Sequence, residues 1–283
     1  MPQAEPGMTL ADSARLNRID AVFDRLRRGG CKGLIAYITA GDPDYDATAE
    51  LVLAMERAGA DLIELGVPFS DPMADGPVIQ RASLRSLSGG TTLAGILGLV
   101  RRLRERTQIP LLLMTYYNPV LHYGLASFAA EAGAMGVDGL IIPDLPVEES
   151  APLLAELHPY HVHLVPFAAP TSTPQRLDRI GQLAQGFVYC VSLTGVTGAR
   201  QGLPPDIEEF MERARARTTQ PLAIGFGISS PEQAALMAKL GDAVIVGSAI
   251  VSLVEQYAAD REQMLERVAS LVQSLKQAIS PAD

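Results

Sequence analysis

The sequence is poor in the residues that build disulfide, metal and nucleic-acid sites. Its two cysteines, Cys31 and Cys190, have neither CxxC nor metal-ligand spacing, so we expect free, reduced thiols in a cytoplasmic protein. Lysine and arginine total 23 against 32 acidic residues, which gives a net charge of -9 and a pI near 5.0. This acidic balance argues against a nucleic-acid partner or an anionic membrane surface, since either would repel the protein.

Long apolar stretches and nucleotide-binding motifs are also missing. No apolar run approaches the ~20 residues that span a bilayer. Residues 1–7 lack the basic and apolar regions of an export signal. Neither G-x-x-x-x-G-K-[ST] nor a proper G-x-G-x-x-G occurs. We therefore expect a soluble, cytoplasmic protein without a membrane partner and without these nucleotide motifs.

What the sequence does contain is an alternation of short apolar runs and amphipathic stretches. The runs end in Gly, Pro, Asp or Asn, as buried strands of a parallel sheet do. Eight strand–helix units without a composition break indicate an α/β fold, a (β/α)8 TIM barrel of about 250 residues. A doubly wound sheet with a small second domain is the alternative. The expected strands cover 33–40, 60–68, 110–118, 139–145, 161–170, 186–195, 221–229 and 243–251, and the expected helices cover 47–58, 93–104, 125–132, 148–157, 174–184, 205–217, 231–240 and 261–279.

Some residues remain before the first expected strand. Residues 13–28 predict an extra N-terminal helix that caps the barrel floor, and residues 1–12 are expected to form a loose leader. The domain assignment is therefore a leader at 1–12 and one barrel at 13–283. In such a barrel, chemistry gathers at the carboxyl ends of the strands.

The second expected strand carries a carboxylate, and the loop after it carries another. Residues 62–77 read LIELGVPFSDPMADGP, with Glu64 inside an apolar run and Asp75 in a proline-stiffened loop. Strand alternation puts Leu62, Glu64 and Gly66 on one face, and the other, wholly apolar face belongs against the helices. Glu64 is therefore expected to point into the barrel, where burial would raise its pKa toward neutrality. Two acids in such different settings suggest divided acid–base work.

Structural roles are the alternative for each acid. Glu64 could be a buried partner of Lys or Arg, but no other expected strand supplies a cation, which favours function. Asp75 precedes Gly76 and could merely form a turn. Its pairing with Glu64 favours function, whereas Asp71 is interpreted as a turn former or partner-facing residue. Asp144 ends the fourth run with an inward parity, which it shares with Leu140 and Ile142; it could be catalytic or orient loops, and we favour the supporting role.

Histidine is absent from the expected catalytic rim. His158, His161 and His163 lie before or at the start of the fifth strand, and His122 lies in a loop. Their H-x-x-H-x-H spacing hints at metal, but a solvated entry to a strand is the favoured interpretation, and no metal site is expected. Acid–base chemistry then falls to carboxylates and to tyrosines, for which the candidates are Tyr116, Tyr117 and Tyr189.

Glycines cluster after the last three expected strands. They occur at 194–198, 225–229 and 247–250, and the last two groups follow strands seven and eight, where barrels commonly bind phosphate. Tight turns are the alternative for any single glycine, but three groups at these strands favour a phosphate site. The sixth loop, 193–203, is long enough to close over a ligand and exclude water.

The motifs together resemble the α subunit family of tryptophan synthase, from near Leu16 to near Ile279. The resemblance is carried by 62–77 and is supported by AGDP at 40–43, PDLPVEE at 143–149, GVTG at 195–198, GFGI at 225–228 and GSAIV at 247–251. It implies reversible retro-aldol cleavage of indole-3-glycerol phosphate to indole and glyceraldehyde 3-phosphate, a lyase reaction of tryptophan biosynthesis, without a cofactor.

The resemblance also implies roles for individual residues. Glu64 would be the general acid–base at indole C3, Asp75 would bind the indole N–H, and Thr197 would orient Asp75 when the sixth loop closes. Positions that contact phosphate in the family correspond to Gly198, Gly227, Gly247 and Ser248, and positions that line the indole pocket correspond to Tyr37, Met114, Tyr116 and Tyr189. Leu193 departs from the pattern, because some members carry Arg there.

A partner is implied as well. The family's β subunit, which holds pyridoxal phosphate, receives indole directly in an α2β2 heterotetramer. The cofactor would belong to that partner, since no lysine of this chain lies at an expected inward strand position. Another phosphate-binding barrel, an isomerase or a flavin enzyme, would share the late glycines but not the Glu64–Asp75 pair. A non-catalytic interaction subunit would tolerate the loss of Glu64, so the presence of this residue argues against it.

Overall fold

The computed structural model describes residues 17–191, 206–225 and 227–280. The strands are β1 (Gly33–Thr39), β2 (Leu62–Gly66), β3 (Leu111–Met114), β4 (Gly139–Ile141), β5 (His163–Val165), β6 (Phe167–Ala168), β7 (Val188–Val191), β8 (Leu222–Gly225) and β9 (Ala243–Val246). The helices are α1 (Arg18–Arg28), α2 (Tyr45–Arg57), α3 (Pro77–Ser88), α4 (Leu93–Arg104), α5 (Tyr117–Tyr123), α6 (Leu125–Met135), α7 (Ala151–Leu157), α8 (Pro174–Leu183), α9 (Ile207–Arg215), α10 (Pro231–Ala238), α11 (Ser248–Tyr257) and α12 (Arg261–Ile279), with 3-10 turns at Val147–Glu149 and His158–Tyr160.

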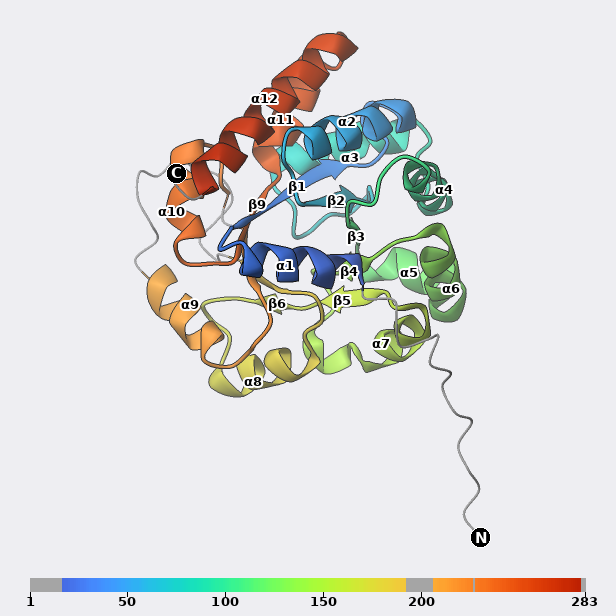
Figure 1. Ribbon diagram of the computed structural model, residues 1–283. Coiled ribbons are helices and arrows are strands. Elements are labelled where there is room, and N and C mark those ends of the chain that lie inside the picture. The colour runs from blue at the N-terminus through green and yellow to red at the C-terminus, as the bar shows by residue number, and fades with distance from the viewer. Residues whose placement is uncertain (1–16, 192–205, 226, 281–283) are drawn as a thin grey trace.

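The strands form one parallel sheet that curls into a barrel, with helices around it (Figure 1). Their order is β5-β4-β3-β2-β1-β9-β8-β7-β6. The two ends of this order are adjacent in the chain, because β5 and β6 are separated only by Pro166. Proline has no N–H to donate, so the fifth predicted strand divides there: β5 pairs with β4, and β6 pairs with β7. The predicted (β/α)8 barrel is confirmed, with its fifth strand in two parts.

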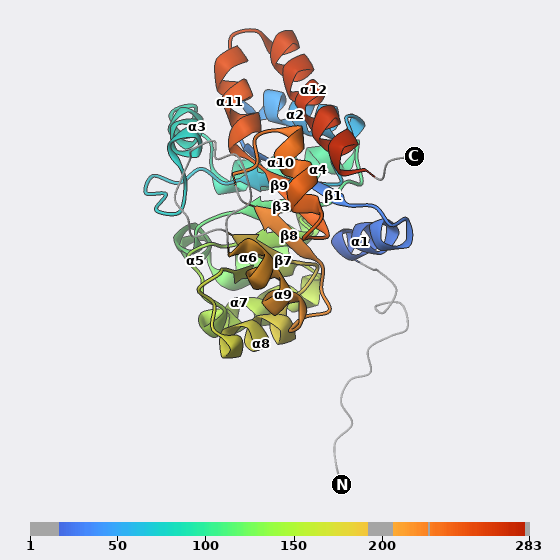
Figure 2. The same cartoon turned by 90° about the vertical axis from the view of Figure 1, so that its left-hand side faces the viewer.

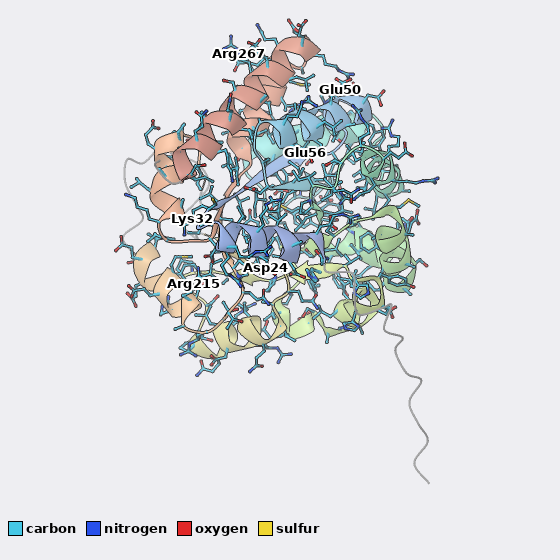
Figure 3. All side chains as sticks on the ribbon, viewed as in Figure 1. Asp24, Lys32, Glu50, Glu56, Arg215 and Arg267 are labelled. Carbon is cyan, nitrogen blue, oxygen red and sulfur yellow. The ribbon has the colours of Figure 1, made fainter. Side chains whose placement is uncertain are left out.

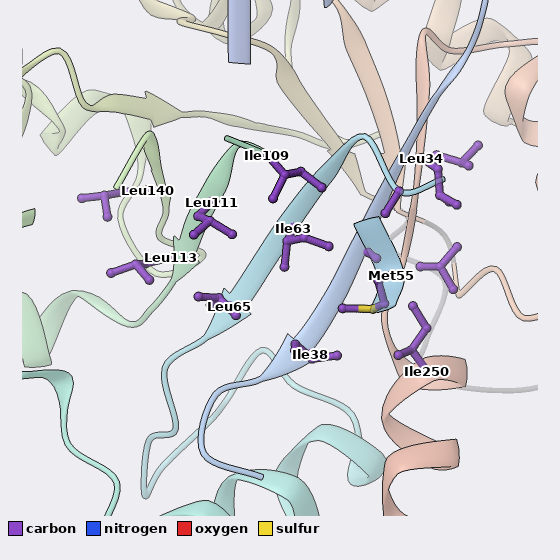
Figure 4. Close-up of a cluster of buried hydrophobic side chains, with 14 of the residues drawn as sticks. Leu34, Ile38, Met55, Ile63, Leu65, Ile109, Leu111, Leu113, Leu140 and Ile250 are labelled. Atoms are coloured by element: carbon purple, nitrogen blue, oxygen red, sulfur yellow. The ribbon is translucent and has the colours of Figure 1, made fainter. Parts of the chain in front are cut away.

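One apolar layer lies between the outside of the barrel and the helices. Figure 4 shows part of it, including Ile63 and Leu65 of β2 beside Leu111 and Leu113 of β3. These side chains are fully buried. Alternate residues of the same strands face the interior, so the predicted apolar outward face of the second strand is confirmed.

A second apolar layer fills the lower half of the barrel interior. Leu62, Leu112 and Ile245 gather there with the buried face of α1, where the Phe23 ring lies 5.6 Å from the Phe187 ring. Figure 2 shows α1 at one end of the barrel and the loop between β2 and α3 at the opposite end. The predicted helix on the barrel floor is therefore confirmed over 18–28. Residues 13–16 and the expected leader at 1–12 lie outside the described residues.

Three aspartates join neighbouring strands at this floor. Asp61, Asp138 and Asp242 each come directly before a strand, and each carboxylate accepts the N–H of a residue in the preceding strand of the sheet, at 2.8 Å in all three cases. Each also pairs with a cation: Lys276, Arg104 and Arg215, respectively. These carboxylates satisfy backbone N–H groups that β pairing leaves free. The same contact therefore links three pairs of neighbouring strands, and we call each such link a joint.

Side-chain caps define where several predicted helices begin. The side chains of Asp44, Thr92, Thr173, Ser230 and Asp260 each accept the backbone N–H three residues on, at the start of α2, α4, α8, α10 and α12. Three helices, α3, α5 and α11, are not predicted from the sequence. Residues 248–251, expected at the end of the last strand, instead open α11.

Charged side chains extend from the outer helices. Figure 3 labels charged side chains such as Glu50 on α2 and Arg267 on α12, which extend outward from the helices. Within the described ranges, no helix combines the length and apolar character needed to cross a membrane.

The Asp138 joint generates a stability prediction. This carboxylate is 3% exposed and bonds Arg104, Arg18 and the Leu111 N–H. We expect Asp138→Asn to lower the free energy of unfolding in urea by about 3 kcal/mol, because Arg104 would stay buried without its counter-charge. Asp178→Asn, which removes the exposed pair with Arg217 at 2.7 Å, should cost less than about 1 kcal/mol. Equal losses in the two variants would contradict this account of the floor.

Candidate active site

Glu64 lies at the centre of the barrel near the carboxyl end of β2. Its side chain is fully buried, and neither carboxylate oxygen has a hydrogen-bond partner among the described residues. Burial alone raises the pKa of Glu64 to about 8. Leu62, two residues earlier, belongs to the interior layer, so the inward orientation predicted from strand alternation is confirmed. A carboxylic acid in this state can donate and recover a proton near neutral pH.

Asp75 lies in the loop between β2 and α3. This loop is at the end of the barrel where the strands have their carboxyl ends, which we call the barrel mouth. The Tyr116 hydroxyl donates to the Asp75 carboxylate at 3.2 Å and accepts the Ala74 N–H at 2.8 Å. The Tyr116 ring in turn stacks on Phe69, with centroids 5.1 Å apart. Burial raises the pKa of Asp75 to about 6, although the Tyr116 hydrogen bond opposes the rise. Asp75 is therefore ionised at neutral pH while Glu64 holds its proton.

Two further tyrosines face the carboxylates inside the barrel. Tyr37 and Tyr189 are almost fully buried. Burial, reinforced by the charges of Asp75 and Glu64, raises the pKa of both hydroxyls, so both stay protonated. Glycines make room for the rings: a Cβ at Gly66 would lie 2.1 Å from the Tyr37 hydroxyl oxygen, and one at Gly225 would lie 2.7 Å from the Tyr189 ring.

An apolar wall completes this side of the mouth. Met114, at the end of β3, contacts the interior layer and a small cluster formed by Tyr37, Ala82 of α3 and Val251 of α11. The predicted pocket residues Tyr37, Met114, Tyr116 and Tyr189 thus lie around the two carboxylates. Sequence reasoning missed Phe167, whose ring lies 4.8 Å from that of Tyr189. It also missed Phe69, although an aromatic residue inside the proline-stiffened loop was a usable signal.

The late glycines mark a second part of the mouth. Gly247 caps the N-terminus of α11, and Ser248 is the first residue of that helix. Gly227 has a φ of 64°, which L side chains rarely adopt, and a Cβ there would lie within 4 Å of none of the described atoms. The free N–H groups of a helix N-terminus attract anions. The remaining predicted contacts, Thr197 and Gly198, lie outside the described residues, as do Leu193 and the sixth loop.

Asp144 has a supporting position, but the sequence-based parity argument for it was wrong. Its carboxylate accepts the Tyr117 N–H at 2.9 Å, which fixes the start of α5 beside Tyr116. Leu140 and Ile142 pack in the outer layer, whereas Ile141 faces the interior, in register with Met114. A wholly apolar strand gives no sign of which face is inward, and β4 ends at Ile141, before the alternation reaches Asp144.

His158, His161 and His163 lie at or before the start of β5, away from Glu64 and Asp75. His163 starts β5, and its Nε2 is 2.8 Å from Asp20 of α1, so it helps to hold the helix on the barrel floor. His158 and His161 lie in and after the turn that precedes this strand. A cavity of about 300 Å³ lies beside the mouth, between the ends of β4 and β5 and the start of α8, and Arg176 contributes to its lining. Asp144 and Phe167 also line it, whereas Glu64, Asp75 and the described residues predicted to contact substrate do not.

Comparisons with known proteins agree with this geometry. The sequence profile described as "Tryptophan synthase alpha chain" matches residues 23–280. The chain belongs to the tryptophan synthase alpha chain family. The alpha chain of Caldanaerobacter subterraneus subsp. tengcongensis is 48% identical over 264 residues, which cover 93% of this chain and all of that relative. The alpha chain of Solibacter usitatus is 52% identical over 243 residues, covering 86% and 91% of the two chains.

Solved tryptophan synthase alpha chains have the same fold. A crystal structure from Legionella pneumophila subsp. pneumophila has a TM-score of 0.86 at 36% identity and covers 94% of this chain and 98% of that one. A Mycobacterium tuberculosis tryptophan synthase structure also gives a TM-score of 0.86, at 36% identity, covering 95% and 100%. The predicted lyase of tryptophan biosynthesis, which cleaves indole-3-glycerol phosphate to indole and glyceraldehyde 3-phosphate, is confirmed by this membership of the tryptophan synthase alpha chain family.

The buried Glu64 generates a pH-dependent stability prediction. Because its folded-state pKa is about 8 against an ordinary 4.5, its favourable contribution is complete below pH 4.5 and is lost as the pH rises to about 8. Glu64→Gln removes this loss. We therefore expect the variant to match the wild type at pH 4.5 and to exceed its free energy of unfolding at pH 8.5 by up to roughly 5 kcal/mol in urea titrations. A difference that is constant with pH would contradict the buried, protonated state.

Proposed function

We propose that Glu64 and Asp75 perform the family's cleavage of indole-3-glycerol phosphate in this chain, with distinct roles. The observation that carries the proposal is the fully buried Glu64 carboxyl group, which has no hydrogen-bond partner among the described residues and which, like Asp75, acts on the buried Tyr37 hydroxyl. A buried carboxyl group without a partner lowers stability, so its presence favours a catalytic use.

Glu64 would act first as an acid and then as a base. Its proton is transferred to indole C3, which converts the ring to the indolenine form. The resulting carboxylate accepts the proton of the side-chain hydroxyl as the carbon–carbon bond to C3 breaks. The bonding electrons return to the ring, and indole and the aldehyde of glyceraldehyde 3-phosphate are released. A pKa near 8 suits both transfers at neutral pH.

Asp75 would bind the indole N–H. At neutral pH this group is an anion, and positive charge develops on the indole nitrogen when C3 is protonated. A carboxylate next to that nitrogen therefore stabilises the indolenine more than the starting indole. Tyr116, which donates to Asp75, would hold the carboxylate in place. Thr197 is proposed to orient Asp75 in the same way when the sixth loop closes.

The other predicted residues would bind the two ends of the substrate. Tyr37, Met114, Tyr116 and Tyr189 are proposed to line the indole pocket, and Gly198, Gly227, Gly247 and Ser248 to contact the phosphate. Helix α11 supports the second assignment, since no described side chain caps its N-terminus, where N–H groups attract anions. Binding energy at the phosphate would position the reacting bond against Glu64.

We further propose a tryptophan synthase β subunit as partner, in an α2β2 heterotetramer in the cytoplasm. Large apolar side chains support a docking surface on the elements that follow β2 and β3: Met73, Leu84 and Leu121 are 95%, 60% and 49% exposed. The α reaction as written needs no cofactor, because every proton has a carboxyl group to move it. Pyridoxal phosphate would reside in the partner. The test of the partnership is indole release measured with and without a cognate β subunit.

Substitution of each carboxyl group tests the proposed reaction. We expect Glu64→Gln to lower indole release at least about 10³-fold while leaving substrate binding nearly intact, because proton transfer is lost but the phosphate contacts are not. Asp75→Asn should lower kcat about 10²-fold. Indole release is followed in single turnovers, and binding by calorimetry with the Glu64 variant. Turnover retained by that variant would refute its role.

The pH profile provides an independent test. Cleavage requires ionised Asp75 and protonated Glu64, so kcat/KM should rise through pH 6 and fall through pH 8. The profile is measured from pH 5 to 9.5 at constant ionic strength. A profile that keeps rising above pH 8.5 would exclude protonated Glu64 as the acid.

A further inference from the structure

Two arginines of α3 share one glutamate of α11. Arg81 Nε and Nη2 donate to the two oxygens of Glu255 at 2.8 and 2.7 Å. Arg85 Nη1 donates to Glu255 at 2.7 Å, and its Nε and Nη2 grip both oxygens of Asp42 at 3.0 and 2.8 Å. Asp42 follows β1 and is 2% exposed. We refer to Arg81, Arg85, Glu255 and Asp42 as the α3–α11 clamp.

Helix α3 forms part of the active site although it carries none of the predicted residues. It begins two residues after Asp75, and the Gln80 side-chain amide donates to the Asp75 carbonyl at 2.8 Å. Its apolar face packs with Tyr37 and Val251 through Ala82. A shift of α3 would therefore move the Asp75 loop and one wall of the indole pocket together.

Helix α11 begins at the other end of the proposed substrate. Gly247 and Ser248 form its N-terminus, and Glu255 lies two turns further along the same helix. The helices α3 and α11 pack against each other, and both belong to the group of helices beside β1 (Figure 2). The clamp thus joins the helix next to Asp75 to the helix at the phosphate end.

The ion pairs of the clamp fix the relative position of α3 and α11 more than they raise the free energy of unfolding. Partly exposed ion pairs add little to stability, but two-pronged arginine–carboxylate bonds fix distance and angle. Hydrogen bonding by Arg81, and then the charges of both arginines, lower the pKa of Glu255 to about 2, so it is ionised wherever the enzyme works. Buried Asp42 keeps Arg85 tied to the rim of β1, so neither helix can move alone without breaking a charged contact.

We propose that Glu255 is a positioning residue: through Arg81 and Arg85, it couples phosphate binding at the N-terminus of α11 to the position of Asp75. This inference rests on the proposed function. In this arrangement, phosphate binding that fixes the position of α11 also fixes the position of α3. Asp75 is thereby held next to the indole nitrogen. Glu255 contacts no reacting atom itself.

The test compares Glu255→Gln with the wild type on two substrates, indole-3-glycerol phosphate and indole-3-glycerol, which lacks the phosphate. The wild type should have the higher kcat on the phosphorylated substrate, because remote binding energy organises the site. In the variant, kcat on the phosphorylated substrate should fall about 10-fold or more, whereas kcat on indole-3-glycerol should stay within about twofold. The advantage that the phosphate confers would then shrink about 10-fold.

Controls separate positioning from general damage. Asp178→Asn, in the exposed pair with Arg217, should leave both rates unchanged. Arg81→Gln breaks the clamp from the opposite helix, at a side chain that is 51% exposed. It should reproduce the kinetic effect of Glu255→Gln, and it keeps the test valid if Glu255→Gln folds poorly.

Two results would overturn the proposal. Equal loss of kcat on both substrates would mean that the clamp only holds the fold. Unchanged kcat on both would mean that the clamp has no part in catalysis. If the wild type itself releases no indole from the phosphorylated substrate, the proposed function fails instead, and the two failures are thereby distinguished.

Discussion

The site depends on removing one carboxyl group from water without giving it a hydrogen-bond partner among the described residues. Glu64 occupies the barrel axis, where cations are absent from the described surroundings and tyrosine rings take up the space above the apolar interior. Burial makes this acid hold its proton, while Asp75, partly buried and bonded to Tyr116, ionises more easily. Two chemically similar groups of one barrel mouth thus exist in opposite protonation states at neutral pH, because their burial and hydrogen bonding differ.

Much of this arrangement could be predicted from the sequence, because it depends on local patterns. The apolar outward face of β2 fixed the direction of Glu64, and the spacing of apolar runs indicated the barrel. The proline within the fifth run was a readable sign that the strand divides at Pro166. The inward face of β4 could not be predicted, because apolar residues occupy both faces of this strand. Only the pairing of Ile141 with Met114 shows which face points inward.

Contacts between distant segments could not be predicted from the sequence, because they depend on how separate elements pack together. The bond from Tyr116 to Asp75 joins residues on different elements, and the link from Arg85 to Glu255 joins α3 to α11 across 170 positions. Helix α11 itself was hidden, because the apolar run at 243–251 continues across the change from strand to helix at Gly247. A glycine followed by serine was the only local sign of that change.

The two ends of the barrel are built on different principles. At the catalytic end, loops and helix termini converge on a shared mouth, so a change in one element reaches the others. At the floor, Asp61, Asp138 and Asp242 each join the neighbouring strand to a cation on a surrounding helix. None of these contacts involves a residue of the loops at the catalytic end. Substitutions in the catalytic loops therefore remove none of the contacts that these three aspartates make at the floor.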